Sequence, residues 1–523
     1  MRLNARYLSN SLFDFIENTK LGDRLFRLGR LAAFGLVLLV VGKFASGQFL
    51  SFRYQDVLFM AIAGVVFMLV FWRWELGIIL VLCSTSFIVY YDVLPTLSLY
   101  HFIPEIPVLE HLRLTLGQGL MLFLLAAFCL SGEIGTARRR LATPVAATVL
   151  LFLLAMLVVS MVGLAFRGVG LRMMVETSRS YWFYLMFFVG ALCLRSRREL
   201  RLLLQACFCM SLIVAVLMYA QFFAGERAKF FLGNSIRVES FGGFAGRILP
   251  PGTELIWTTV PFVVSRIPLC SPRGARGLYL ALFLLLGGLL LTFTRSIWLG
   301  VLLSMAIMAV LGRGAIRLGV ARIFLAMVVS VALLLLLLSI VSTERENYMT
   351  PYIKRFTSIF KAESYAEGSS AGARFMEISA AWPKIVEHPW LGIGVGGVYR
   401  YEEDWDEIWQ SHYWRPVSYI HNAYVLLLTQ GGVLALGTCL TMFLTFFVRA
   451  RRVYHTLQSP EDRSIVIACI GSTASILLAS VMQPSLWYPP AVPCLALMLG
   501  IVEAVRYFSE RDAEAAVVWD SSR

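Results

Sequence analysis

The chain has 523 residues, of which 59% are apolar and only 15% are charged, and its formal net charge is +14. Soluble proteins carry about 25% charged residues, so a string of soluble domains, a disordered chain and a collagen-like chain are all excluded. A charge of +14 would indicate nucleic-acid binding in a soluble protein, whereas in a membrane protein it indicates basic loops on the cytoplasmic side.

The N-terminal residues 1–30 are basic and show no cleavable signal peptide. We predict a cytoplasmic segment, either an amphipathic helix on the membrane surface or a solvated tail. Apolar runs of about 20 residues, the length of one helix across a bilayer, then recur along the chain. These runs lie near 31–49, 56–71, 75–91, 113–131, 144–165, 181–195, 201–223, 253–270, 276–294, 295–312, 318–341, 430–449, 464–483 and 486–505. The sequence therefore predicts an all-α integral membrane protein with about 12–14 transmembrane helices, the shortest runs being compatible with partial or tilted helices.

The positions of the basic residues predict the orientation of the chain. If the N-terminus is cytoplasmic and the runs alternate, the arginine clusters at 138–140, 195–198, 313–322 and 449–452 all fall in cytoplasmic loops. The positive excess then lies on the cytoplasmic side, the outer side is close to neutral, and both termini are cytoplasmic. This distribution argues against nucleic acid as a partner.

Three segments predicted on the outer side are much longer than the other loops; they lie at 92–112, 224–252 and 343–418. A loop as long as 343–418 is usually functional or disordered, and its content of Trp and Tyr argues against disorder. Within it, Phe375, Ile378, Ala381, Trp382 and Ile385 recur at helical spacing, which predicts an amphipathic helix over 371–388. The predicted organisation is a cytoplasmic segment at 1–30, eleven helices in 31–342, a large outer loop at 343–418 with candidate site residues, further helices in 419–505 and a cytoplasmic tail at 506–523.

Arg295 stands between two apolar runs at the outer side. Thr294 can cap the helix that begins there, which would leave amide groups, a partial positive charge and a guanidinium together as a site for a diphosphate. The alternative is an arginine whose side chain reaches the lipid headgroups.

His421, followed by Asn422, opens an apolar helical run. An imidazole can take a proton from a sugar hydroxyl, although a histidine in this position can also be a simple interfacial residue. Of the other outer arginines, Arg374 can instead pair with Glu377 three residues later. Arg179 precedes an aromatic belt at 181–184 and can instead extend towards the headgroups.

The order of these motifs resembles the O-antigen ligase and polymerase superfamily, which are bacterial glycosyltransferases that act on polyprenyl-diphosphate-linked glycans at the periplasmic face. The resemblance rests on Thr294-Arg295-Ser296, the string Glu387-His388-Pro389-Trp390-Leu391-Gly392-Ile393-Gly394, the pair His421-Asn422 and the later Gln430-Gly431-Gly432. Family arginines fall on Arg295, on Arg374 ahead of Trp382 and, more loosely, on Arg247 ahead of Pro250-Pro251.

The resemblance implies a GT-C-like fold in the bacterial inner membrane and a periplasmic active site that transfers a glycan from undecaprenyl diphosphate to a sugar hydroxyl with inversion. The assigned residues are His421 and Arg295 for catalysis, Arg247, Arg374 and Arg179 for the diphosphate, and Asn422, Gly392 and Gly394 in support. We expect no metal and no cofactor, because diphosphate is already a good leaving group.

The acceptor stays open in this interpretation. A polymerase for O-antigen or exopolysaccharide is favoured, and a ligase whose acceptor is the lipid A core of lipopolysaccharide is the alternative. A transporter or flippase is the alternative from another class, although such proteins usually show internal repeats and charges at the membrane midplane. The expected partners are the lipid-linked donor, a glycan or lipid-linked acceptor, membrane lipids and, as further candidates, chain-length regulator and flippase proteins.

Overall fold

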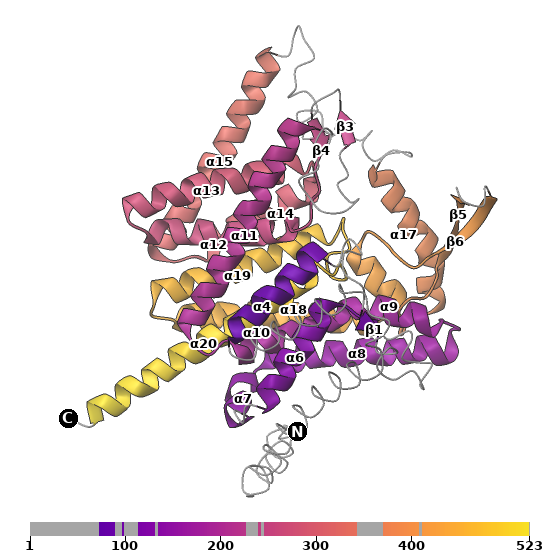
Figure 1. Cartoon of the computed structure of the whole chain (residues 1–523), viewed down its shortest axis with the longest axis horizontal. Helices are drawn as coiled ribbons and strands as arrows, with labels where there is room; N and C mark the ends of the chain where they lie inside the picture. The colour runs from indigo at the N-terminus through magenta and orange to yellow at the C-terminus, as the bar shows by residue number, and fades with distance from the viewer. Residues whose placement is uncertain are drawn as a thin grey trace, which may run out of the picture.

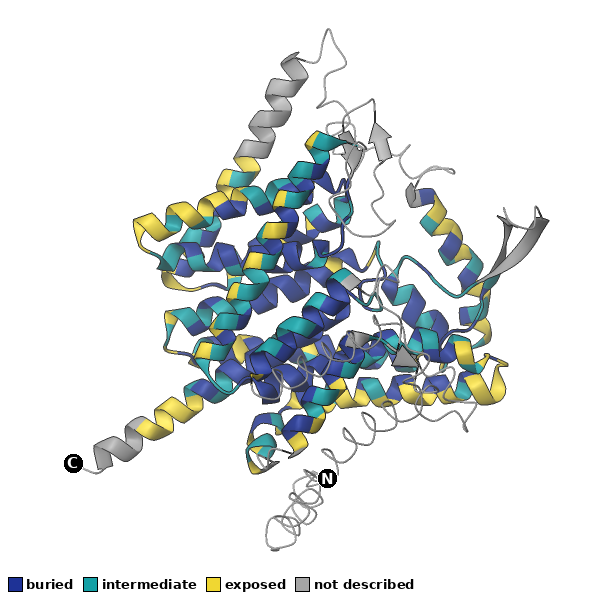
Figure 2. Cartoon of the chain, in the orientation of Figure 1, coloured by how far each residue is buried: buried dark blue, intermediate teal, exposed yellow. Residues whose placement is uncertain are grey.

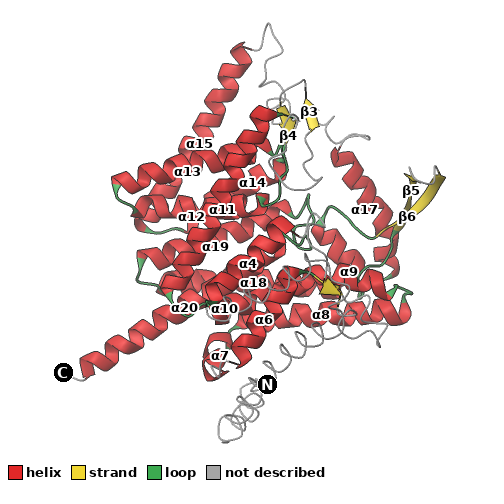
Figure 3. Cartoon of the chain, in the orientation of Figure 1, coloured by secondary structure: helices red, strands yellow, loops and turns green. Residues whose placement is uncertain are grey.

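The computed structural model describes residues 73–88, 97–98, 113–130, 134–225, 239–241, 245–341, 370–406 and 411–521. The predicted N-terminal segment 1–30, the apolar runs at 31–49 and 56–71, and most of the outer segment 92–112 lie outside these ranges. In the described ranges the chain is nearly all helical, with three short two-stranded sheets as the exceptions (Figure 3).

The helices follow the apolar runs of the sequence (Figure 1). They are α4 (Trp74–Cys83), α6 (Leu116–Leu130), α7 (Ile134–Leu141), α8 (Pro144–Phe166), α9 (Leu171–Trp182), α10 (Met186–Cys193), α11 (Arg197–Ala224), α12 (Thr253–Arg266), α13 (Pro272–Leu291), α14 (Arg295–Leu311), α15 (Gly314–Val341), α17 (Ser370–Glu387), α18 (Ala423–Thr456), α19 (Pro460–Ala479) and α20 (Ala491–Ser521). Within the described residues, six of them are long and apolar enough to cross a membrane: α8, α11, α13, α18, α19 and α20. The predicted class, an all-α integral membrane protein, is confirmed.

The sequence misplaced several helix boundaries: α18 begins at Ala423, seven residues before the run predicted at 430–449, and α20 continues to Ser521, through most of the tail predicted at 506–523. The run predicted at 181–195 begins ten residues earlier, as α9, and continues through a 3-10 turn at Phe183–Leu185 into α10. The predicted aromatic belt at 181–184 is also wrong in its orientation, since Tyr181, Phe183 and Tyr184 are fully buried. The Tyr184 hydroxyl donates a hydrogen bond to the Leu486 carbonyl at 3.1 Å, so this run packs into the protein instead of facing headgroups.

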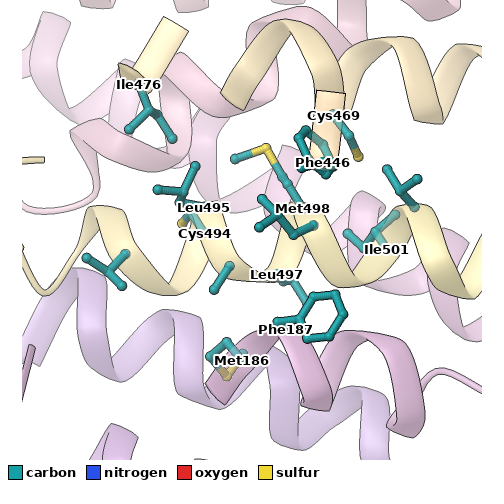
Figure 4. Packing of buried hydrophobic residues seen from close by; sticks show 14 of the residues in the cluster. Met186, Phe187, Phe446, Cys469, Ile476, Cys494, Leu495, Leu497, Met498 and Ile501 are labelled. Carbon is teal, nitrogen blue, oxygen red and sulfur yellow. The ribbon is translucent and has the colours of Figure 1, made fainter. Parts of the chain in front are cut away.

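The core of the bundle is built around α19 and α20. Most residues in the apolar parts of these two helices are buried, whereas most of those in α8, α11 and α13 are only partly buried or exposed (Figure 2). Such exposed apolar faces suit contact with lipid. Apolar side chains from α10, α18, α19 and α20 fill the space between these helices (Figure 4).

Small residues let the central helices approach closely. A Cβ atom on Gly500 of α20 would lie 2.4 Å from the Phe187 carbonyl oxygen of α10. A Cβ atom on Gly300 of α14 would lie 2.8 Å from the Ser475 carbonyl oxygen of α19. Close backbone contact through small residues is the usual way in which membrane helices pack.

The remaining elements gather at one end of the bundle, which we call the outer end after the orientation predicted from charge. Helix α17 and the hairpins β3–β4 (Glu239–Phe241, Ala245–Arg247) and β5–β6 (Arg400–Asp406, Ser411–Val417) lie there, away from the C-terminus (Figure 1). A two-residue pair, β1–β2 (Leu97–Ser98, Arg113–Leu114), completes the sheets of the described chain. The described parts of the segments predicted as 224–252 and 343–418 therefore share one end.

The opposite, inner end is held together by ion pairs. Arg197 at the start of α11 bonds to Asp462 at 2.8 Å, and it also pairs with Asp512 of α20. The buried carboxylate of Glu503 forms ion pairs with Arg449 at 3.3 Å and with Arg506 at 2.8 Å. These contacts tie α11, α18, α19 and α20 together at the end that is rich in arginine.

Candidate functional site

His421 and Glu377 form a hydrogen-bonded pair at the outer end. The Glu377 carboxylate accepts the His421 backbone N–H at 2.9 Å with one oxygen and contacts Nδ1 of the imidazole at 2.7 Å with the other. Glu377 is buried on α17, whereas the His421 side chain is 39% exposed just before α18. A buried carboxylate thus fixes the orientation of an imidazole that is partly accessible.

The charge on Glu377 is stabilised by this pairing. Burial by itself would raise the pKa of Glu377, but the hydrogen bonds from His421 and the charges of His421 and Arg400 hold it below its ordinary value. A carboxylate at Nδ1 favours the tautomer that carries its proton on Nδ1. We infer this tautomer from the contact between Glu377 and Nδ1. In it, Nε2 has a lone pair that can accept a proton.

The position of Glu377 adds to the prediction for α17. Both carboxylate oxygens of Glu377 bond to His421, and the pairing of Arg374 with Glu377 stays a prediction. The face of α17 that packs on the protein holds Glu377, Ala381 and Ile385, at intervals of four residues, whereas Trp382 is 56% exposed. Sequence reasoning missed Glu377 as a site residue; the available signal was an acidic residue on the same helical face as Ala381 and Ile385.

Aromatic rings border His421. Tyr419 meets the imidazole edge to face with ring centroids 4.9 Å apart, and Trp487 lies 5.8 Å from Tyr419. The indole N–H of Trp487 donates to the Thr177 carbonyl at 3.0 Å. Residue Thr177 lies on α9 two positions before Arg179, which is half-buried, so the structure brings the helix of Arg179 towards the His421 region.

Asn422 is the N-cap of α18. Its side-chain oxygen accepts the backbone N–H groups of Tyr424 at 3.0 Å and Val425 at 3.1 Å. Asn422 therefore fixes the start of the helix that follows His421, as an N-cap residue does.

The glycine turn after α17 inserts into α18. Gly432 breaks this helix with φ 59°, a conformation that favours glycine. The loop then replaces the missing helical hydrogen bonds. The N–H groups of Ile393 and Gly394 donate to the carbonyls of Thr429 and Gln430, both at 2.9 Å.

In return, the N–H groups of Val433 and Leu434 donate to the Pro389 and Trp390 carbonyls at 2.8 and 3.2 Å. A Cβ atom at Gly392 would lie 2.5 Å from the backbone of Gln430, and one at Gly394 would lie 2.4 Å from the Cα of Gly163 on α8. Gly392 and Gly394, predicted as supporting residues, thus hold the outer loop against two helices.

Arg295 begins α14 at the same end. Thr294 occupies the N-cap position as predicted, but the predicted cap bond does not form, because its hydroxyl donates to the Thr292 carbonyl at 3.1 Å. The neighbouring Ser296 hydroxyl accepts the side chain of Gln483 at 2.9 Å. The Ser480 carbonyl, three residues before Gln483, accepts the N–H of Ala423 at 2.9 Å, so the turn after α19 contacts the starts of both α14 and α18.

The contacts of the other two candidate arginines, Arg247 and Arg374, are described only in part. The backbone of Arg247 pairs with Glu239 in the β3–β4 hairpin, and the next residue, Ile248, donates to the Leu291 carbonyl at 3.1 Å, just before the turn that leads to Arg295. The side chain of Arg247 lies outside the described parts of the structure. Arg374 is half-buried on α17, one turn before Glu377.

No group of three or more His, Cys, Asp or Glu side chains suited to a metal occurs in the described ranges. The expectation of a metal-free site therefore remains a prediction.

These features define a multi-pass helical membrane protein with a carboxylate–histidine pair and an arginine-headed helix at one end. Residues 280–440 match the family model described as O-antigen ligase, which supports the O-antigen ligase and polymerase superfamily indicated by the motifs. The matched stretch contains Arg295, Arg374, Glu377 and His421, whereas Arg179 and Arg247 precede it. No curated protein matches the chain.

Proposed function

We propose that the protein is an inverting glycosyltransferase that moves a glycan from undecaprenyl diphosphate to an acceptor sugar hydroxyl at the periplasmic face of the bacterial inner membrane. The observation that carries the proposal is the bond between the buried Glu377 carboxylate and Nδ1 of the partly exposed His421 imidazole. This arrangement suits a general base that is oriented by a carboxylate.

His421 is the base in this proposal. Its Nε2 accepts the proton of the acceptor hydroxyl while the hydroxyl oxygen bonds to the anomeric carbon of the donor sugar. The bond from that carbon to the diphosphate oxygen breaks at the same time, and undecaprenyl diphosphate leaves. Glu377 positions the imidazole and stabilises the imidazolium that forms, without accepting the proton itself.

Arg295 stabilises the departing diphosphate. A guanidinium at the first position of α14 acts together with the partial positive charge of the helix N-terminus. Arg247, Arg374 and Arg179 are the further candidates for binding the diphosphate, because each belongs to a segment at the outer end. Diphosphate leaves readily, so the displacement as proposed requires neither a metal nor a cofactor.

A groove beside the site suits the lipid part of the donor. A groove of about 760 Å³ lies between α14, α18 and α19. Tyr424 and Val481 line it near the outer end, and Leu311 and Arg451 line it near the inner end. Its wall is otherwise apolar, so a polyprenyl chain can lie along it while its diphosphate meets the start of α14.

The acceptor distinguishes the two forms of the proposal. Another lipid-linked repeat unit would make the protein an O-antigen or exopolysaccharide polymerase, which we favour, and the lipid A core would make it a ligase. Chain-length regulator and flippase proteins would be partners of the first form.

The test uses the purified protein in lipid nanodiscs with a glycan on undecaprenyl diphosphate and a chelator present. Transfer to a second lipid-linked glycan, with inversion at the anomeric carbon, is the expected result. Transfer only to a lipid A core would establish the ligase form. Transport of the intact donor across a vesicle membrane without any transfer would contradict the enzyme and favour the flippase.

A further inference from the structure

A second cavity lies towards the inner end of the bundle, away from the His421 site at the outer end. It has a volume of about 480 Å³ and is enclosed by α11, α12, α13, α19 and α20. Cavities of this size hold drug-sized ligands, so this one has room for part of a lipid. Neither the proposed reaction nor the family match makes use of it.

The cavity has a charged mouth. Arg201 on the second turn of α11, Arg266 at the end of α12 and Glu461 at the start of α19 all line it. Arg266 pairs with Glu461, which leaves the charge of Arg201 in excess. Within the described residues no carboxylate pairs with Arg201, whose Nε donates to the Arg197 carbonyl at 3.4 Å.

The interior of the cavity is apolar. Phe208, Phe262, Leu497 and Ile501 are among the residues that line it. The two threonine hydroxyls in the wall are already bonded within the protein: Thr258 donates to the Glu254 carbonyl at 2.8 Å, and Thr259 contacts Ser211 at 2.9 Å. A polar solute would find few hydrogen-bond partners there, whereas a hydrocarbon chain needs none.

We propose that this cavity binds an anionic phospholipid of the cytoplasmic leaflet, with its phosphate at Arg201 and an acyl chain between α11, α12 and α20. Charge complementarity supports this occupant. The inner end carries the arginine clusters of the chain, and basic pockets between helices on that side bind anionic headgroups. The polyprenyl donor fits less well, because its diphosphate would lie at the end opposite Arg295 and His421.

The test compares two charge reversals on the same helix. Arg201→Glu changes the mouth of the cavity, whereas Arg198→Glu changes an exposed arginine of α11 that does not line it. Native mass spectrometry of the full chain in detergent measures the binding of long-chain phosphatidylglycerol, of phosphatidylcholine with the same chains and of dihexanoyl-phosphatidylglycerol. Unfolding curves of both variants verify that they are folded.

We expect the wild type and Arg198→Glu to retain long-chain phosphatidylglycerol, and Arg201→Glu to bind it about tenfold more weakly. Phosphatidylcholine and the short-chain lipid should bind weakly in every case. Equal loss in both variants, equal binding of phosphatidylcholine, or equal binding of the short-chain lipid would overturn the proposal. Displacement of phosphatidylglycerol by an equimolar amount of undecaprenyl phosphate would overturn it in favour of the donor lipid.

Discussion

The carboxylate of Glu377 contacts two groups of His421, the backbone N–H at 2.9 Å and the ring nitrogen Nδ1 at 2.7 Å. The two residues come from α17 and from the start of α18, which are separated by a glycine turn and a β-hairpin. The position of the His421 imidazole therefore depends on how the outer loop docks on the bundle.

Replacing Glu377 with Gln should lower kcat about 100-fold or more while changing KM little. The amide keeps an oxygen for the backbone N–H, but its NH₂ group directs the Nδ1 lone pair towards itself and so places the imidazole proton on Nε2. The base is then lost although the contact remains. Steady-state rates of glycan transfer measure the effect.

Glu387→Gln is the matched control on the same helix. Glu387 is exposed and pairs with Lys384 at 3.0 Å, so its replacement should leave kcat unchanged. Equal rates for Glu377→Gln and Glu387→Gln would show that Glu377 does not position the base.

The stability of the outer loop should depend on acid pH through Glu377. Its pKa lies below the usual value of 4.5 in the folded protein, so the unfolded chain binds the proton first. The stabilisation is therefore fully present above about pH 4.5 and is lost as the pH falls through the lower folded value. The thermal unfolding midpoints of the wild type and Glu377→Gln should differ at pH 7 and draw closer as the pH falls below about 4.5. A constant gap between them would contradict this account.

Gly432→Ala should destabilise the protein by about 2 kcal/mol or more, because a side chain is strained at φ 59° and its Cβ would lie 2.3 Å from the Trp390 carbonyl carbon. The glycine turn would be pushed away from α18. Gly437→Ala on the same helix meets no atom within 4 Å and should instead be neutral or stabilising by up to about 1 kcal/mol. Unfolding in detergent measures both variants, and similar midpoints would refute the role given to the helix break.

Arg295→Ala should reduce kcat by about 100- to 1000-fold, as expected when a group that stabilises developing charge is removed. Arg295→Lys should recover part of the rate, because it keeps the charge and loses the bidentate geometry. Arg172→Ala is the control: Arg172 is exposed on α9 and pairs with Glu176 at 3.0 Å. Unchanged rates for Arg295→Ala would remove Arg295 from the proposed reaction.

The sequence predicted the bundle well because bilayer thickness fixes the length of apolar runs, and α8, α11 and α13 begin and end within a few residues of their runs. It predicted α17 by spacing, and Ala381 and Ile385 of the predicted apolar face are buried. Phe375 and Trp382 of the same face are exposed, because helical periodicity does not show which part of an apolar face docks on the protein. Partners distant in sequence, such as Glu377 with His421 or Gly394 with Gly163, depend on docking that no local pattern encodes.

The rate of glycan transfer from undecaprenyl diphosphate by His421→Ala tests the central claim most directly. The measurement is a single-turnover assay with saturating donor and acceptor, in which binding no longer limits the rate. We predict a rate about 10²- to 10⁴-fold below the wild type, with donor binding retained. Transfer at the wild-type rate by folded His421→Ala would contradict the assignment of His421 as the base.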